Sequence, residues 1–228
     1  LQGLGAVAVA LTANAFATVV VFGFSLEYDN TSIYDPYWHL SPPVIIFYWI
    51  WCRALEGPPV HACDNFRLSA IAGIQLLWCI RLTFNWVRGW SGLDHEDWRY
   101  ADLRTGVRKL GLGEGVYWMC VSLPAFHGVP TAVVSAALLP AWVAISFEGC
   151  ASSGAFDVAG AAVGLGGVLM QTVADEQLRI YRRMPAPRPG AFGEGVADVG
   201  LWRYSRHPNY LGELLHWLSY VLYAIGAG

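Results

Sequence analysis

The sequence of residues 201–213 is LWRYSRHPNYLGE. This stretch combines two Arg, a His, an Asn, two Tyr and a Glu, and it runs directly into an apolar segment over residues 211–227. Polar groups at the mouth of a helix that enters a bilayer need partners. Pro208 is pre-set for the first turn of a helix, and the free amide groups of that turn favour an anion. The stretch therefore predicts the start of a membrane helix with a polar, anion-binding mouth.

The composition of the whole chain is that of a membrane protein. Of its 228 residues, 55% are hydrophobic and only 14% are charged, whereas an average globular domain carries roughly 25% charged residues. The mean hydropathy is +0.40. A net charge of −3 argues against a nucleic-acid partner, and the five Cys show no CxxC or Cys/His metal spacing. We therefore predict an integral membrane protein without a metal site.

The apolar runs predict the fold class, an all-α polytopic helix bundle that forms a single membrane domain over residues 1–228. A run of about 20 apolar residues is long enough to cross a bilayer. The six predicted spans are 1–24, 41–55, 68–90, 113–147, 156–174 and 211–227. A polar connection is predicted over residues 25–40, and a charged interfacial helix over residues 92–110.

The run 113–147 is the ambiguous one. As one straight helix it would reach roughly 50 Å, and it contains Pro124, Pro130 and Pro140. It is either one kinked, tilted span or two short spans. A single crossing places the basic connections 92–110 and 177–206 on the same membrane face, as the distribution of Lys and Arg in membrane proteins favours. We count it as one span.

A second polar set follows the spacing of one helical stripe, at Gln171, Asp175, Arg179 and Arg182. Asp175 and Arg179 are four residues apart and can form an ion pair. The stripe is either a solvated helix end with snorkelling side chains or the wall of a polar pocket, with Arg groups suited to phosphate. Arg81, inside the third predicted span, has the same two interpretations.

The opening stretch adds neutral hydrogen-bonding groups to this stripe. Arg206 and His207 precede the predicted helix, and Asn209 and Glu213 share one of its faces. Such a set suits a ligand with phosphates and an amide- or hydroxyl-bearing ring, such as a dinucleotide. No GxGxxG follows a strand pattern, so a site of this kind is not of the Rossmann type.

These residues carry a family resemblance. Residues 200–213 resemble the C-terminal signature of the steroid 5-alpha-reductase superfamily, in its broad branch. Four further stretches resemble elements of the same superfamily: residues 174–177 (ADEQ) with Arg182, residues 78–82 (WCIRL), residues 97–100 (DWRY) and residues 35–38 (DPYW). The resemblance covers most of the chain.

The resemblance implies a membrane reductase that uses NADPH to reduce a carbon–carbon double bond conjugated to a carbonyl, in a steroid or another lipid. The endoplasmic reticulum and the mitochondrial inner membrane are the candidate locations. The cofactor-binding residues that it implies are Gln171, Asp175, Arg179, Arg182, Tyr204, Arg206, His207, Asn209, Tyr210 and Glu213.

The residues that would donate a proton are less evident. The carbonyl oxygen gains charge during such a reduction and needs a proton donor nearby. The superfamily uses a Glu–Tyr pair from earlier helices, but this chain has Trp78 where the Tyr is expected. Asp35 and His39 are the catalytic candidates in its place, and Asp35 can equally be a loop cap near the membrane surface.

Two alternatives stay open. Superfamily members continue past this point with another helix and a terminal basic segment, which we expect to be absent from this chain. Either that segment is missing from the given sequence, or the protein has lost it. The second case favours an inactive scaffold or lipid-binding subunit of a larger membrane assembly over a reductase. The pattern Arg-His-Pro-x-Tyr-x-Gly also occurs in membrane methyltransferases that bind S-adenosylmethionine, although Asn209 and Glu213 favour the reductase.

Overall fold

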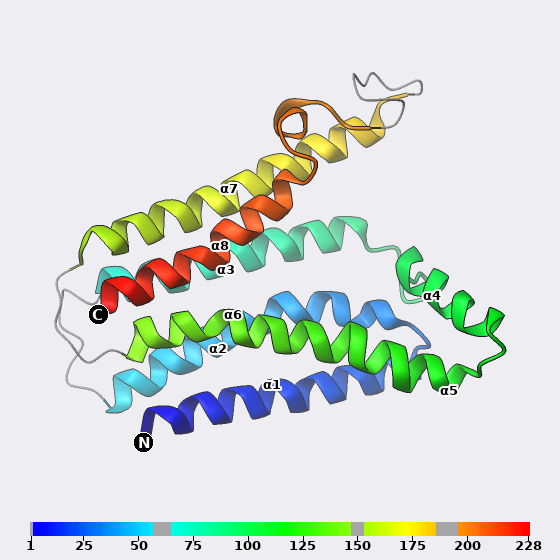
Figure 1. The fold of residues 1–228 in the computed structure, drawn as a ribbon, viewed down its shortest axis with the longest axis horizontal. Helices are drawn as coiled ribbons and strands as arrows, with labels where there is room; N and C mark the ends of the chain where they lie inside the picture. Colours follow the sequence, from blue (N-terminus) through cyan, green and yellow to red (C-terminus); the bar gives the residue numbers. More distant parts are fainter. Residues whose placement is uncertain (1, 57–64, 147–152, 186–195) are drawn as a thin grey trace. The chain divides into compact units, whose positions relative to one another are not determined.

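The computed structural model describes residues 2–56, 65–146, 153–185 and 196–228, and within these ranges it contains helices and no strand (Figure 1). The predicted all-α fold class is thereby confirmed. The chain divides into two compact units. One comprises Leu1–Pro59 with Leu82–Ser146, and the other comprises Val60–Arg81 with Phe147–Gly228.

The first unit is built around three packed helices. Its elements are α1 (Gln2–Glu27), a 3-10 turn (Thr31–Ile33), α2 (Tyr34–Glu56), the C-terminal end of α3 (Asn65–Gly89), α4 (Trp98–Lys109), α5 (Glu114–Val116), a π-helix (Tyr117–Gly128) and α6 (Val129–Ser146). Helices α1, α2 and α6 lie side by side (Figure 1). The indole rings of Trp49 and Trp142 meet edge to face at 5.4 Å between α2 and α6.

The start of α2 corrects the sequence prediction. The helix begins at Tyr34, so residues 34–40 are helical and do not continue the predicted polar connection. The Pro42-Pro43 pair, taken as the start of the span, lies inside the helix. Pro36, in the first turn, is the proline that marks the start, because its missing N–H would be unpaired there in any case.

The apolar run 113–147, whose three prolines left the number of spans open, forms one uninterrupted helical segment. Helix α5, the π-helix and α6 follow one another without a break from Glu114 to Ser146. The π-helix contains Pro124, and the backbone N–H of Val129 donates to the Pro124 carbonyl, five residues back. The wider π turns accommodate a proline that would break an α-helical ladder. This geometry agrees with one long crossing and not with two separate short ones.

The second unit is a set of three helices with a short turn. It contains the N-terminal part of α3, α7 (Ala155–Arg183), a 3-10 turn (Gly200–Arg203) and α8 (Pro208–Ala227). Helix α7 packs along α8. The predicted stripe continues in helical conformation to the end of α7, and α8 begins at the predicted Pro208.

Glycines allow α7 and α8 to approach closely. A Cβ atom on Gly212 would lie 2.7 Å from the Gly167 carbonyl oxygen and 2.7 Å from Gln171 Cγ. Both distances are shorter than van der Waals contact. Small residues at such crossings are typical of helices that pack inside membranes.

This contact predicts the effect of a single methyl group. Gly212→Ala is expected to destabilise the protein by about 1–3 kcal/mol through overpacking. The matched control is Gly166→Ala, because a Cβ at Gly166 meets nothing within 4 Å, and alanine there favours the helix by up to about 1 kcal/mol. Thermal unfolding in detergent measures both variants. Equal midpoints for the two would contradict the close crossing.

A buried ion pair ties the far ends of the three helices of this unit together. Arg67 donates through Nε to Asp157 Oδ1 at 2.5 Å and through Nη2 to Asp157 Oδ2 at 3.0 Å. The same Nη2 donates to the carbonyl of Gly226 at 2.7 Å. These contacts join α3, α7 and α8, and Asp157 also accepts from the backbone N–H of Gly154 at 2.8 Å.

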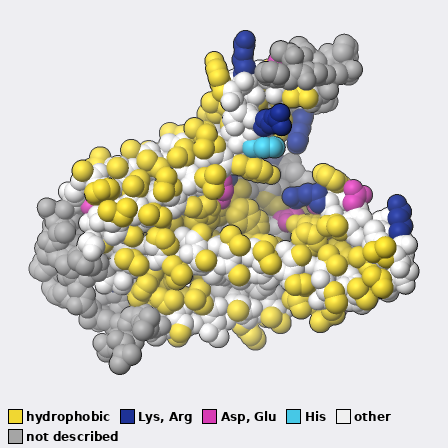
Figure 2. Space-filling view, viewed as in Figure 1, with side chains coloured by type: hydrophobic (Ala, Val, Ile, Leu, Met, Phe, Trp, Pro, Cys, Tyr) yellow, Lys and Arg dark blue, Asp and Glu magenta, His cyan; other side chains and the backbone are white. Residues whose placement is uncertain are grey.

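Four helical segments within the described ranges are long and apolar enough to cross a membrane: Gly5–Glu27, Phe66–Gly89, Glu114–Ser146 and Ala155–Arg183. Hydrophobic side chains cover much of the surface that Figure 2 shows. The chain thus has the character of an integral membrane protein. Helices α2 and α8, the other two predicted spans, do not meet the same criterion, so six spans remain a prediction.

Candidate functional site

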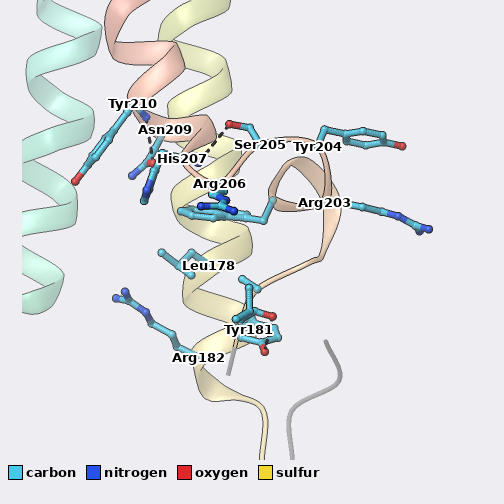
Figure 3. A pocket seen from close by; sticks show the side chains of 13 residues that line it. Leu178, Tyr181, Arg182, Arg203, Tyr204, Ser205, Arg206, His207, Asn209 and Tyr210 are labelled. Carbon is cyan, nitrogen blue, oxygen red and sulfur yellow. Dashed lines mark hydrogen bonds between the residues drawn. The ribbon is translucent and has the colours of Figure 1, made fainter. Parts of the chain in front are cut away.

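The second unit contains a cavity of about 860 Å³ beside the C-terminal end of α7 (Figure 3). Six predicted cofactor residues line it: Arg182, Tyr204, Arg206, His207, Asn209 and Tyr210. Figure 3 shows Arg182, His207, Asn209 and Tyr210 on one side of α7, whereas Arg203 and Tyr204 point away from it. The structure therefore brings Arg182, the last residue of the stripe, together with the opening stretch around this cavity.

Two hydrogen bonds hold the 3-10 turn (Gly200–Arg203), which borders the cavity, against α7. The side chain of Gln177 accepts a hydrogen bond from the backbone N–H of Leu201 at 2.8 Å. Trp202 Nε1 donates to the carbonyl oxygen of Ala174 at 2.8 Å. Gly200, with φ of 55°, supplies the backbone turn that both contacts require. From the sequence, no role in the site was predicted for Gln177, Gly200 or Trp202.

The cavity is electropositive. Arg182, Arg203, Arg206 and His207 line it, and none of the described residues that line it is acidic. Pro208 occupies the first turn of α8, so the N-terminal end of that helix faces the same region. The imidazole of His207 stacks on the ring of Tyr210, with centroids 5.1 Å apart. This donor set suits an anion with several oxygens, phosphate above all.

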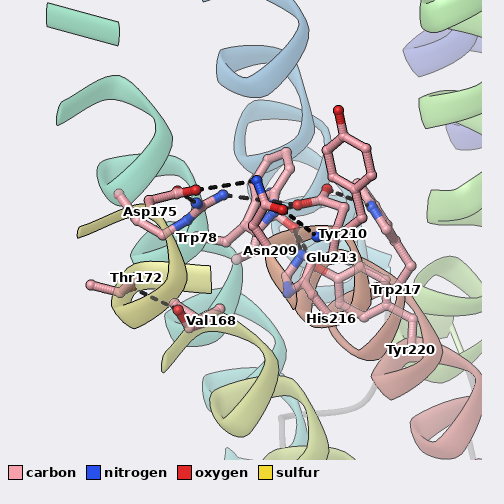
Figure 4. Close-up of polar contacts among 12 residues, drawn as sticks. Trp78, Val168, Thr172, Asp175, Asn209, Tyr210, Glu213, His216, Trp217 and Tyr220 are labelled. Atoms are coloured by element: carbon pink, nitrogen blue, oxygen red, sulfur yellow. Dashed lines mark hydrogen bonds and ion pairs between the residues drawn. The ribbon is translucent and has the colours of Figure 1, made fainter. Parts of the chain in front are cut away.

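A polar cluster adjoins the cavity through Asn209 (Figure 4). Asn209 Nδ2 donates to Asp175 Oδ1 at 3.3 Å, and Arg81 Nη1 donates to Asp175 Oδ2 at 2.5 Å. Arg81 Nη2 also lies 3.9 Å from Glu213 Oε2. Arg81 is therefore paired inside the unit. Of the two interpretations of Arg81, the structure favours a side chain paired within the helix bundle over one that snorkels to the headgroups.

Two indole groups hold the carboxylate of Glu213. Trp78 Nε1 donates to Oε2 at 3.0 Å, and Trp217 Nε1 donates to Oε1 at 2.8 Å (Figure 4). Trp78 thus fixes the orientation of a predicted cofactor residue. Sequence reasoning missed Trp217, although its spacing of four residues from Glu213 was a readable signal.

Two residues of the predicted stripe behave differently from expectation. The predicted pair of Asp175 with Arg179 is wrong, because Arg179 pairs with Glu176 and Asp175 pairs with Arg81. Arg179 therefore takes no part in the cluster. Gln171 is fully buried against Gly212, outside the residues that line the cavity, and neither of its amide atoms has a hydrogen-bond partner.

The predicted catalytic residues belong to the first unit. Asp35, in the first turn of α2, accepts a hydrogen bond from the hydroxyl of Tyr100 at 2.7 Å. Burial raises the pKa of the Asp35 carboxyl to about 6, against the opposing effects of the Tyr100 hydrogen bond and the Arg99 charge. His39 is buried, and its Nε2 lies 3.1 Å from the hydroxyl of Thr83. Asp35 thus has a stable polar partner, and His39 has the environment of a core histidine.

The raised pKa of Asp35 predicts a pH dependence of stability. The folded state binds the Asp35 proton more tightly than the unfolded state, so this contribution is fully present below about pH 4. It is lost as the pH rises through about 6. Asp35→Asn is expected to remove most of the change in the free energy of unfolding between pH 4 and 6. At pH 7 the variant should be more stable than the unaltered chain by at most about 3 kcal/mol. Thermal unfolding across this range measures it. The exposed Asp102→Asn is the control, and identical profiles for the two variants would refute the assignment.

Within the described ranges, no three His, Cys, Asp or Glu side chains are placed to hold a metal ion.

Comparison with known proteins gives two matches. The family model described as "Protein of unknown function (DUF1295)" matches residues 21–228. The "Uncharacterized protein C594.04c" of Schizosaccharomyces pombe is 27% identical over 220 residues, which cover 90% of this chain. The chain spans 60% of the length of that relative. No solved structure matches the chain. Since the family model extends over nearly the whole sequence, the chain belongs to the DUF1295 family.

Proposed function

We propose that the chain is a membrane-embedded, NADPH-dependent reductase of the steroid 5-alpha-reductase superfamily. It acts on a carbon–carbon double bond conjugated to a carbonyl, in a steroid or another lipid. One observation carries the proposal: Arg182, Arg206 and His207 line a single cavity at the N-terminal end of α8, with no acidic residue among its described lining. The motif at residues 200–213 supplies the independent support.

The donor set fits the phosphates of such a cofactor. Arg182 and Arg206 offer planar guanidinium groups, which bind phosphate oxygens in pairs. Arg206 has no ion pair or hydrogen bond to any other described residue, so its donors are available to a ligand. The cavity volume of about 860 Å³ lies within the range of small-molecule sites. The aromatic rings of His207 and Tyr210 add a flat surface on which a base can stack.

The polar cluster that contains Asn209, Asp175 and Glu213 suits the nicotinamide group of the ligand, which carries no phosphate. When bound, NADPH supplies the hydride. The chain contributes the amide of Asn209, held by Asp175, and the carboxylate of Glu213, held by two indole groups. Groups that are fixed before the ligand arrives lose little freedom on binding. Asp35 remains the proposed proton donor, because its raised pKa near 6 lets it carry a proton close to neutral pH.

The charge of the cavity favours this reading over a methyltransferase. S-adenosylmethionine carries a sulfonium cation and no phosphate. The guanidinium groups of Arg182 and Arg206 in one cavity repel such a cation and attract a polyphosphate. The same argument applies to any cationic ligand of this site.

Native mass spectrometry of the chain released from lipid nanodiscs tests the proposal. We expect NADPH or its oxidised form to copurify with the protein. NADPH deuterated at the transferable position should pass its deuterium to the conjugated double bond of the lipid substrate, so that the reduced product carries the label. Copurified S-adenosylmethionine would overturn the proposal in favour of a methyltransferase, and a cavity that holds only lipid would favour a scaffold.

A further inference from the structure

We infer that α4 lies in the headgroup layer of the bilayer, with Leu103 and Leu110 inserted into its apolar boundary. The first observation is the connection of this helix to its neighbours. Residues 90–97 join α4 to the end of α3, and residues 110–113 join it to α5. Both neighbours belong to segments long and apolar enough to span a membrane. Short connectors to two span ends keep α4 at the membrane surface.

Three contacts fix the rotation of α4 about its axis. Tyr100 donates to Asp35 at 2.7 Å. Arg104 donates to Asp29 Oδ1 at 2.5 Å and to Glu114 Oε2 at 2.7 Å. The face of α4 that bears Tyr100 and Arg104 is thus held against the rest of the first unit, and the other faces are free to meet the surroundings.

The distribution of side chains on α4 is inverted relative to a helix in water. The guanidinium-bearing Arg104 is buried, with 9% of the residue exposed. Leu103 is 49% exposed, and Leu110, the residue that caps the C-terminal end of α4, is 76% exposed. Their spacing of seven residues places them on one flank, which bears the exposed Arg99 one turn before Leu103. A helix surrounded by water would gain by burying these leucines. Their exposure is favourable where the surrounding medium is itself apolar.

The remaining faces match the water side of an interface. Asp102, Thr105 and Lys109 share a face by their spacing of three and four residues, and all three are exposed. Trp98, at the N-terminal end of the same face, is 70% exposed. Trp86 and Trp90, at the end of α3, lie with ring centroids 4.8 Å apart. Tryptophan collects at the boundary between hydrocarbon and headgroups. A helix with exposed leucines on one flank, exposed polar groups on another face and Trp residues at its N-terminal end and beside it has the character of an interfacial helix.

The occupant of this flank is therefore the acyl–headgroup boundary of a phospholipid bilayer. Exposed charges near it have both signs: Arg108 is paired with Glu114, and Arg99 is paired with Asp97. Insertion of the leucines, and not attraction to anionic lipid, supplies the affinity. We accordingly expect the placement of α4 to be the same in phosphatidylcholine and in phosphatidylglycerol.

Spin labels on α4 test the inference. Labels at Leu103→Cys and Leu110→Cys, in a chain whose native Cys are replaced by Ser, are compared with labels at Asp102→Cys and Thr105→Cys in phosphatidylcholine nanodiscs. We expect the first two to be relaxed several-fold more by oxygen, which dissolves in lipid, than by a water-soluble nickel chelate. The two control positions should show the reverse. Equal access of the nickel chelate to all four positions would overturn the inference, as would protection of Leu103 and Leu110 from both reagents, which indicates a protein partner.

A second measurement uses the unaltered chain. A phosphatidylcholine with a photoreactive group at the headgroup–acyl junction should label the peptide that contains residues 103–112 in intact nanodiscs. Leu112, which is 45% exposed, belongs to the same peptide. Labelling confined to the spanning segments, with none on this peptide, would contradict the placement of α4.

Discussion

Arg182→Ala is expected to weaken NADPH binding by about 10- to 100-fold, the loss of charge-assisted hydrogen bonds worth about 1.5–3 kcal/mol. Asn209→Ala is expected to weaken it by about tenfold, because a neutral amide contributes less. Both residues line the cavity and lie on the same side of α7 (Figure 3). Fluorescence titration of NADPH into the purified variants in nanodiscs measures the affinity, and thermal unfolding confirms that each variant is folded.

Arg203→Ala is the matched control for Arg182→Ala. Both changes remove one positive charge from the region of the cavity, but the side chain of Arg203 points away from α7 (Figure 3). A long-range charge effect is screened by salt, whereas a direct contact is much less so. Arg203→Ala should therefore cost little affinity at physiological salt. Equal losses for the two variants, or unchanged affinity for Arg182→Ala and Asn209→Ala together, would refute the assignment of this cavity.

Arg67→Met is expected to destabilise the protein by about 3–5 kcal/mol, the cost of leaving one member of a buried ion pair without its partner. Only 4% of Arg67 and none of Asp157 is exposed. The substitution also frees the carbonyl of Gly226, which Arg67 holds at the end of α8. Equilibrium unfolding in mixed detergent measures the loss of stability.

The double variant Arg67→Met/Asp157→Leu separates the buried charge from the packing. Replacing both members of a buried pair by apolar residues is often close to neutral. We expect the double variant to recover much of the stability that Arg67→Met loses, apart from the hydrogen bond from Gly154 to Asp157. The single variant Asp157→Leu completes the comparison. If the double variant loses as much unfolding free energy as the two single variants together, the cost comes from packing and not from the unpaired carboxylate.

Local signals were sufficient to predict the start of α8 and the polar stripe of α7, of which Arg182 lines the cavity. Pro208 marked the start of α8, and the three- and four-residue spacing from Gln171 to Arg182 defined one stripe of α7. Both are properties of a single helix, and they follow from backbone geometry. Their meeting around one cavity was expected only because both were polar at the ends of apolar runs.

Contacts between helices could not be predicted in the same way. Arg67 and Asp157 lie far apart in the sequence, and neither belongs to a motif, so nothing local announced their pairing. Asp175 had two candidate partners, and Arg81 on another helix proved to be the one, in place of Arg179 on its own helix. The early start of α2 was missed because a Pro pair inside a helix resembles a helix start.

The first unit supplies a further lesson about polar residues near a membrane. Arg104 is buried and pairs with Asp29 and Glu114, although a charged residue outside the apolar runs is ordinarily expected at the surface. Its neighbour Leu103 is exposed. The two carboxylate partners compensate the burial of the Arg104 charge, and a pattern read along one helix does not reveal partners that lie outside it.

Equilibrium binding of NADPH to the unaltered chain in nanodiscs tests the central claim most directly. The electropositive cavity predicts saturable binding of one NADPH per chain, weakened by rising salt as expected for phosphate contacts. S-adenosylmethionine at the same concentrations should neither bind nor compete. Absence of saturable NADPH binding to the folded chain, or displacement of NADPH by S-adenosylmethionine, would contradict the account.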